Sequence, residues 1–285
     1  MKAIAAALLF LLAGAAPAKV AVGQWSYGLA ASGGSVWVGG LERGGIYRVD
    51  PGTGRVTAHV PAGSKIFNLA SAPGAVWAVS QLEDTVTRID TRTAKPTLTL
   101  HVGYGPYDVA WGFGSAWVSN AGQGSVWRIT GRKVVAKIKT GYEPNGLTAY
   151  HGALWVTDHT AGELLRIDPA TNRITRKVAL AGADWITGYG DALYVSQETD
   201  VVSRVDLRTL KVTGRVKVAR NPLGSAIVGG KLWVPCIDAN TIVVVDPTSM
   251  KVVERKPGGP SPIVVLPAYG HTWVSHTFAD YVSRY

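Results

Sequence analysis

A short phrase recurs seven times along this chain at intervals of about forty residues, and it limits the possible folds more than any other feature. The phrase consists of a small residue, an apolar residue, an aromatic residue and usually Val; Arg, an apolar residue and Asp commonly follow about ten residues later. The aromatic residues of the seven phrases are Trp37, Trp77, Trp117, Trp155, Tyr194, Trp233 and Trp273. Seven copies of one unit predict an array of equal modules.

Each unit contains four short runs of alternating apolar residues, and turn residues separate the runs. In the first unit the runs are Gly28–Ala31, Val36–Gly39, Ile46–Val49 and Val56–Val60. The composition agrees with strands, because the chain has 34 Gly and 10 Trp but only 2 Met. Four short strands cannot bury both faces of their sheet, whereas units stacked around an axis cover one another. The sequence therefore predicts an all-β, seven-bladed β-propeller with four-stranded blades.

The last unit indicates how the ring closes, because it stops at Tyr285 after its third strand. The missing strand is offered by Lys19–Gly23, which lines up with Lys137–Gly141, the fourth strand of the third unit. We expect this amino-terminal strand to complete the last blade and to remove two sheet edges. Residues 19–285 would then form a single propeller domain. A closed ring needs no partner to cover its edges, so we expect a monomer.

The first eighteen residues have the pattern of a secretory signal peptide. Lys2 supplies the positive charge, residues 3–15 form an apolar stretch, and Ala16–Ala18 provides an A-x-A cleavage site. The apolar stretch is short for a bilayer span, so we expect no stable membrane span after cleavage, and an uncleaved anchor is the alternative. We expect residues 1–18 to be removed and the protein to be exported to the periplasm or the extracellular space. Loss of Lys2 lowers the formal net charge from +10 to +9.

The repeats Leu165–Ile174 (LRIDPATNRI) and Tyr47–Val56 (YRVDPGTGRV) resemble those of the YVTN-type seven-bladed propellers. They are also similar to the repeats of the streptogramin (virginiamycin B) lyase group, which carry a Trp in a similar second strand. Both resemblances imply the propeller fold for the whole mature chain. The roles that they imply include single-stranded DNA binding, adhesion and a magnesium-dependent ring-opening lyase activity.

Repeats of the lyase group usually carry Glu three residues after the Trp, and no unit of this chain does. The residues at that position are Gly40, Ser80, Asn120, Asp158, Gln197, Cys236 and His276. We therefore predict no metal ligands and no cofactor, and we expect Mg²⁺ only under the lyase alternative. That alternative would use His159 or His276 as a base. Asp158 or Glu198 would be its carboxylate. No compact ligand spacing joins these residues, and ordinary polar loop residues are the competing interpretation.

The loops on one face of the predicted ring hold the candidate ligand-binding residues. In a propeller the fourth-to-first and the second-to-third connections of the blades share one face, and ligands usually bind there. The residues that we expect to contact a ligand are Trp25, Tyr27, Lys65, Tyr104, Tyr142, Glu143, Asp184, Trp185 and Arg220. Trp25 and Trp185 lie outside the aromatic position of the repeat, which favours ligand contact, although packing on adjacent loops is the alternative.

Two sets of basic residues recur with the repeat. The first follows the third strands and predicts a ring of charge on the opposite face: Arg55, Lys95, Lys133, Arg173, Lys211 and Lys251. This ring is either a solvated turn position that the repeat copies or a surface for an anionic polymer. The second set lies within the third strands: Arg48, Arg88, Arg128, Arg166, Arg204 and Arg284. Its repetition indicates bonds between blades, because one active site would not need six copies.

These observations favour a binding or interaction module over an enzyme. The module would have an aromatic channel mouth, a basic surface and an unknown ligand, with nucleic acid, such as single-stranded DNA, or an acidic glycan as candidate anionic polymers. The alternative from a different class is a metal-dependent lyase similar to the streptogramin lyases.

Overall fold

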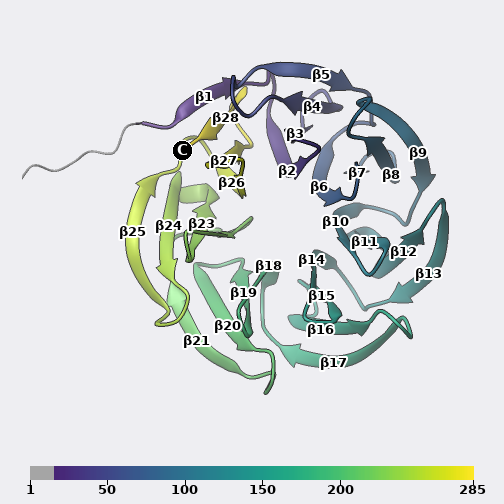
Figure 1. The fold of residues 1–285 in the computed structure, drawn as a ribbon. Coiled ribbons are helices and arrows are strands. Elements are labelled where there is room, and N and C mark those ends of the chain that lie inside the picture. Colours follow the sequence, from purple (N-terminus) through teal and green to yellow (C-terminus); the bar gives the residue numbers. More distant parts are fainter. Residues whose placement is uncertain (1–15) are drawn as a thin grey trace, which may run out of the picture.

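The computed structural model describes residues 16–285 and contains seven four-stranded antiparallel sheets arranged as blades around a central axis (Figure 1). The predicted all-β, seven-bladed propeller is confirmed. The first strands of the blades, which surround the axis, are β2 (Ser26–Ser32), β6 (Ile66–Ala72), β10 (Pro106–Gly112), β14 (Pro144–Tyr150), β18 (Ala183–Tyr189), β22 (Ala226–Val228) and β26 (Pro262–Ala268). The second strands are β3 (Ser35–Gly40), β7 (Ala75–Ser80), β11 (Ser115–Asn120), β15 (Ala153–Asp158), β19 (Ala192–Gln197), β23 (Lys231–Cys236) and β27 (His271–His276).

The outer half of each blade consists of a third and a fourth strand. The third strands are β4 (Ile46–Val49), β8 (Thr85–Asp90), β12 (Ser125–Thr130), β16 (Glu163–Asp168), β20 (Val201–Asp206), β24 (Thr241–Asp246) and β28 (Tyr281–Arg284). The fourth strands are β5 (Val56–Val60), β9 (Lys95–His101), β13 (Lys133–Lys139), β17 (Arg173–Ala179), β21 (Val212–Lys217), β25 (Lys251–Pro257) and β1 (Ala18–Ala21). Two short 3₁₀ helices, η1 (Ala121–Gln123) and η2 (Ile237–Ala239), follow second strands.

The amino-terminal strand closes the ring as predicted. The seventh sheet has the order β1-β28-β27-β26, so the outer strand of the last blade comes from the beginning of the fold. Lys19 pairs with Ser283, and Val20 pairs with Val282. Val20 is buried in one apolar cluster with Val282 and Trp273. Residues 1–15 of the predicted signal peptide lie outside the described residues, and cleavage after Ala18 stays a prediction.

The repeated aromatic residue of a blade fills the space between that blade and the next one. Trp37 on β3 is fully buried and packs with Leu69 and Val76 of the second blade. Its indole Nε1 donates a hydrogen bond to the backbone oxygen of Ser32, 3.0 Å away, so the polar atom of this large ring is satisfied. The same bond to the residue five positions earlier is made by Trp117, Trp155 and Trp273.

Two of the six repeated arginines of the third strands, Arg128 and Arg284, join blades as predicted. The prediction does not hold for the other four, which bond to side chains of their own blade: Arg48, Arg88, Arg166 and Arg204. The guanidinium of Arg128 lies 4.7 Å from the centroid of the Trp117 ring. Its Nη1 donates a hydrogen bond to the backbone oxygen of Pro169 in the next blade, at 2.5 Å. Arg284 makes the corresponding bond to Pro51, at 2.9 Å, and so connects the seventh blade to the first.

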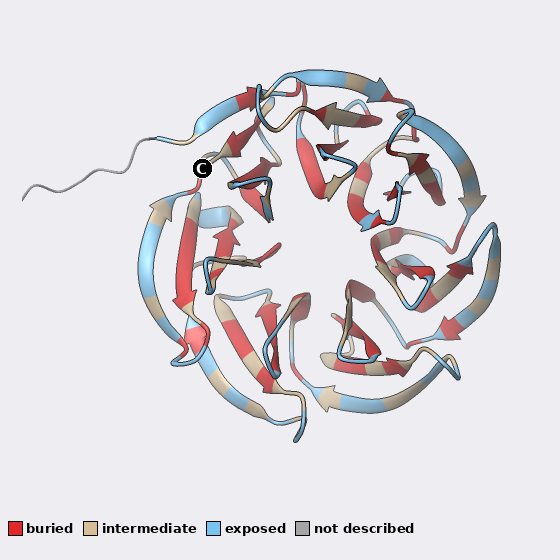
Figure 2. Ribbon diagram, viewed as in Figure 1, coloured by how far each residue is buried: buried red, intermediate tan, exposed pale blue. Residues whose placement is uncertain are grey.

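Burial is greatest in the second strands and least in the outer fourth strands (Figure 2). The second strand β11 is buried along its whole length, whereas the outer strand β13 alternates between exposed and buried or half-buried residues. Basic side chains on outer strands discourage edge-to-edge pairing with another sheet. The predicted basic positions that follow the third strands lie in or beside the third-to-fourth turns, on the face opposite the ligand-binding loops. Among residues 16–285, no helix has the length and hydropathy that a bilayer crossing requires.

A substitution in β1 should test the ring closure. Val20→Ser places a hydroxyl in the apolar cluster and is expected to lower the free energy of unfolding by about 2 kcal/mol. The matched control Ala21→Ser adds the same hydroxyl at an exposed residue of the same strand and should change this free energy by less than about 0.5 kcal/mol. Guanidinium unfolding followed by tryptophan fluorescence measures both. Equal midpoints for the two variants would show that β1 does not stabilise the ring.

Candidate functional site

The mouth face of the ring, which carries the fourth-to-first and second-to-third connections, has a groove of about 720 Å³ over blades two, three and four. Two loops from successive blades supply its aromatic side chains, Tyr104 and Tyr142. Leu82, Asp84 and Glu143 also line it. Of the nine predicted ligand-binding residues, the structure brings Tyr104, Tyr142 and Glu143 together in this groove.

The two tyrosines are held in equivalent loops and remain largely exposed, at 69% for Tyr104 and 72% for Tyr142. Each loop has the sequence Gly-Tyr-x-Pro, at 103–106 and 141–144. Gly105 in the first loop has φ of 62°, and its N–H donates to Asp84 Oδ1 at 2.9 Å. Two large aromatic rings therefore face solvent along one groove.

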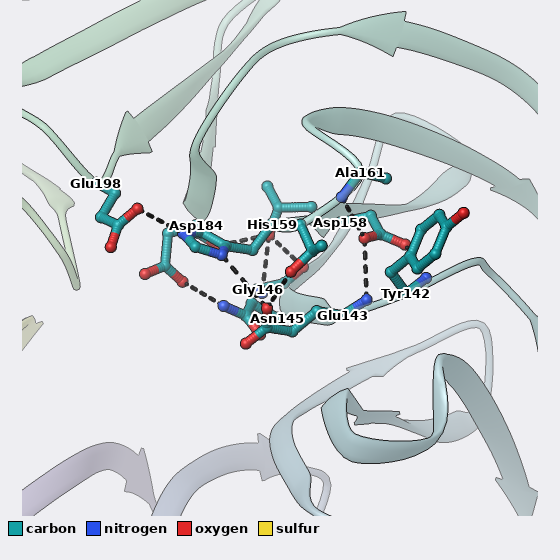
Figure 3. Close-up of polar contacts among 11 residues, drawn as sticks. Tyr142, Glu143, Asn145, Gly146, Asp158, His159, Ala161, Asp184 and Glu198 are labelled. Carbon is teal, nitrogen blue, oxygen red and sulfur yellow. Dashed lines mark hydrogen bonds and ion pairs between the residues drawn. The ribbon is translucent and has the colours of Figure 1, made fainter.

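Asp158, which was a predicted catalytic carboxylate, instead holds the second tyrosine loop. It is fully buried at the end of β15, and its carboxylate accepts hydrogen bonds from the backbone N–H groups of Tyr142, Glu143 and Ala161, at 3.0 to 3.1 Å. These contacts are drawn in Figure 3. Asp158 is the last residue of β15, directly before the connection in which the sequence predicted it, and its side chain turns inward to accept the three backbone N–H groups.

His276, the other predicted base on an equivalent connection, is likewise fully buried. Its Nδ1 lies 3.1 Å from the backbone oxygen of Pro260, and its Nε2 lies 2.8 Å from Ser283 Oγ. A carbonyl only accepts, so Nδ1 carries the proton and Nε2 accepts from the serine hydroxyl. Burial lowers the pKa of His276 to about 4, which keeps the ring neutral. The His276 ring is therefore enclosed in blade seven and not exposed at the mouth, and its catalytic role stays a prediction.

His159 is the predicted histidine that does lie at the mouth, and carboxylates surround it (Figure 3). Its Nε2 is 3.1 Å from Glu198 Oε2, and its Nδ1 is 3.4 Å from Glu143 Oε2. The hydroxyl of Thr160 also donates to Glu143. Burial alone would lower the pKa of His159, but the charges of Asp184, Glu143 and Glu198 outweigh it and raise this pKa. The ion pairs hold Glu143 at the edge of the groove.

Three predicted residues, Tyr27, Asp184 and Trp185, belong to the central channel beneath the mouth. Trp185 lines a cavity of about 290 Å³ there. The hydroxyl of Tyr27 is 3.2 Å from that of Tyr107, and burial raises the pKa of Tyr27. Burial also raises the pKa of Asp184, whose Oδ1 accepts a hydrogen bond from Asn145 at 3.1 Å. The three predicted side chains therefore do not line the mouth groove.

The remaining three predicted residues lie outside the groove. Trp25 is half-exposed and makes an edge contact with Phe278, at 5.2 Å between centroids. The ammonium of Lys65 lies 5.6 Å from the ring centroid of Phe67. Arg220 is 3.6 Å from Asp238 in an exposed ion pair.

The groove is acidic although the protein as a whole is basic. Asp84 and Glu143 line it, and within residues 16–285 none of its lining residues is a lysine or an arginine. An anionic ligand would therefore meet repulsion at this position. No group of three or more His, Cys, Asp or Glu side chains in the described part of the chain is arranged to hold a metal ion.

Sequence reasoning missed the contributions of Leu82, Asp84 and Thr160 to the groove. They belong to the second-to-third connections of blades two and four. The predicted topology could have identified them, because the second-to-third connection of one blade lies beside the fourth-to-first connection that enters the next blade. Asp84 shows this directly by binding the Gly105 N–H.

No protein-family model matches this chain, and neither does any curated protein. Solved structures that are similar include a streptogramin B lyase, with a TM-score of 0.81 and 16% identity over 94% of this chain and 96% of that chain. A hydrazine synthase from Kuenenia stuttgartiensis also has a TM-score of 0.81 and 16% identity, over 93% of this chain and 96% of the other. The β-propeller domain of Cps50 (Swd1) from Myceliophteria thermophila has a TM-score of 0.78 and 15% identity, over 95% and 98%.

These similarities show the fold, and they include the streptogramin lyase group that the repeats resemble. Identities of 15% to 16% do not transfer an activity, and the neighbours carry different names. The finer resemblance to YVTN repeats is not shown and stays an expectation.

Replacing His159 should flatten the pH dependence of stability. Because folding raises the pKa of His159, its bound proton stabilises the fold below the ordinary histidine pKa of about 6.5, and this contribution is lost as the pH rises through the raised value. The free energy of unfolding should fall more between about pH 6 and about pH 8 in the wild type than in His159→Gln.

The control for this measurement is His151→Gln, at an exposed histidine in the turn between β14 and β15, on the opposite face. Denaturant titrations at both pH values give the slopes. A His159→Gln slope equal to that of the wild type would contradict the ion pairs described for this residue.

Proposed function

We propose that this protein is a binding module whose mouth groove holds an uncharged oligosaccharide. The observation that carries the proposal is the pair of exposed tyrosines, Tyr104 and Tyr142, on equivalent loops along one groove. The flat apolar side of a pyranose ring can stack on a tyrosine ring, and two tyrosines offer two such platforms. The volume of about 720 Å³ lies within the range of small-molecule sites, roughly 300–1,000 Å³.

The polar groups of the groove complement sugar hydroxyls. Asp84 and Glu143 present carboxylate oxygens, which accept hydrogen bonds and cannot donate them when ionised. Sugar hydroxyls donate such bonds, and hydrogen bonds to a charged acceptor are stronger than neutral ones. The pairing of Glu143 with His159 fixes the position of this acceptor before the ligand arrives. If the amino-terminal segment directs export, as we propose, the protein would meet glycans outside the cytoplasm.

Binding without turnover accounts for the acid–base candidates better than a lyase. His159 and Glu198 lie at the mouth, but each is paired within the cluster that holds Glu143. His276 and Asp158 are buried and bonded to backbone or hydroxyl groups. We therefore assign these side chains to the support of a binding surface, with the acidic groove favouring neutral over anionic ligands.

Removing either tyrosine ring should weaken sugar binding. Tyr104→Ala and Tyr142→Ala are each expected to lower the affinity about tenfold, because each loses a stacking contact of about 1.4 kcal/mol. The probes are cellohexaose, chitohexaose and mannohexaose, titrated into the full chain by calorimetry. The matched control Tyr269→Ala removes an exposed tyrosine from the turn between β26 and β27, on the opposite face, and should leave the affinity unchanged.

Two results would overturn this proposal. One is the absence of heat change with all three oligosaccharides. The other is tighter binding of single-stranded DNA than of any oligosaccharide, with loss of that binding in Tyr104→Ala and Tyr142→Ala, which would assign the groove to an anionic polymer.

A further inference from the structure

A second, smaller groove lies on the outer half of blade three, and its residues play no part in the mouth groove. It has a volume of about 260 Å³ and is lined by Gln123, Ser125, Trp127, Lys137 and Lys139. Ser125 is paired with Lys139, and Trp127 with Lys137, across strands β12 and β13. Since alternate residues of a strand face the same side, these four side chains form one patch.

Hydrogen-bond donors in this outer groove lack acceptors. Ser125 is only 8% exposed, yet its hydroxyl has no hydrogen-bond partner in the described structure. Within residues 16–285, no carboxylate lies at ion-pair distance from Lys137 or Lys139. A buried polar group without a partner costs stability, so a ligand that accepts hydrogen bonds would satisfy it.

The aromatic ring of the groove positions one of the charges. The ammonium of Lys137 lies 3.8 Å from the centroid of the Trp127 ring, which is close for a cation–π contact. This contact limits the freedom of a long side chain and keeps its charge over the Trp127 ring, which lines the same groove as Ser125. Less side-chain entropy is then lost when an anion binds.

Blade four has a different arrangement of charges at the same positions. There Glu163 replaces Ser125, Lys177 corresponds to Lys137, and Ala179 corresponds to Lys139. Lys177 Nζ is paired with Glu163 Oε2 at 2.7 Å, so blade four neutralises its own lysine. Blade three has a hydroxyl in place of the carboxylate and a second lysine, so its outer groove has a surplus of positive charge and donors.

We propose that the outer groove of blade three binds a tetrahedral oxyanion, the phosphate or sulfate group of a larger ligand. Two ammonium groups supply the charge for such an anion, and the Ser125 hydroxyl supplies a directed donor. The amide of Gln123 adds a donor at the end of the groove. The inference does not rest on the oligosaccharide proposal, since it uses different residues.

The test measures binding of inorganic phosphate and inorganic sulfate to the full chain by calorimetry, with ionic strength held constant by sodium chloride. We expect saturable binding of at least one ion to the wild type. Ser125→Glu copies blade four, so its carboxylate should pair with a lysine and weaken the binding at least tenfold. The double substitution Lys137→Met and Lys139→Met should do the same. The matched control Lys177→Met removes the paired lysine of blade four and should leave the affinity unchanged.

Either of two outcomes would overturn the inference. The first is the absence of saturable binding of either ion to the wild type. The second is binding of the ions to Ser125→Glu and Lys177→Met with the affinity of the wild type, which would indicate an adventitious ion only. Unfolding midpoints of all variants confirm that each is folded. A parallel titration with the oligosaccharides separates the two proposals, because Ser125→Glu should bind them as the wild type does.

Discussion

The structure depends on one large aromatic side chain packed between each blade and its neighbour, which is buried in six blades and half-buried in the sixth blade, at Trp233. Trp37 illustrates the arrangement, because its ring packs on the next blade while its Nε1 is bonded within its own blade. A ring of this size exposed to water on an isolated blade would destabilise it, so each blade needs its neighbour. Every blade has this need, so the packing is complete only when the seventh blade contacts the first, where Arg284 bonds to Pro51.

This rigid ring allows its loops to carry exposed side chains. Asp158, buried at the end of β15, fixes the backbone of the loop that presents Tyr142. Asp84 fixes the loop that presents Tyr104 through Gly105. The exposed aromatic surface is therefore supported by two carboxylates, of which Asp158 is buried and Asp84 is half-buried. The acidic mouth and the basic outer groove of blade three are distinct electrostatic environments on one small protein, so its net charge describes neither of them.

The fold could be predicted from the sequence because its main determinant is periodic. An aromatic residue at intervals of about forty residues, Trp in six units and Tyr194 in one, gives the number of blades, and the similarity of Lys19–Gly23 to a fourth strand predicts the closure. The site is not periodic, and sequence position gave only the face on which a residue lies. Whether a side chain turns inward, as in His276, depends on which buried groups need partners. The sequence did not predict the outer groove. Finding it requires the cross-strand partner of Ser125 and the comparison with Glu163, which occupies the same position in blade four.

The pairing of β1 with β28 has a consequence for the order of folding. Lys19 and Ser283 are partners in the last blade, so this sheet needs two segments from opposite ends of the domain. During synthesis β1 emerges first and its partner last, and the six other blades, each built from consecutive strands, can form between these events. Closure is the contact of greatest sequence separation, and contacts of this kind slow folding. Until it forms, one aromatic seam of the ring stays open to water and to other chains, which makes the interval before closure the period of greatest exposure to aggregation.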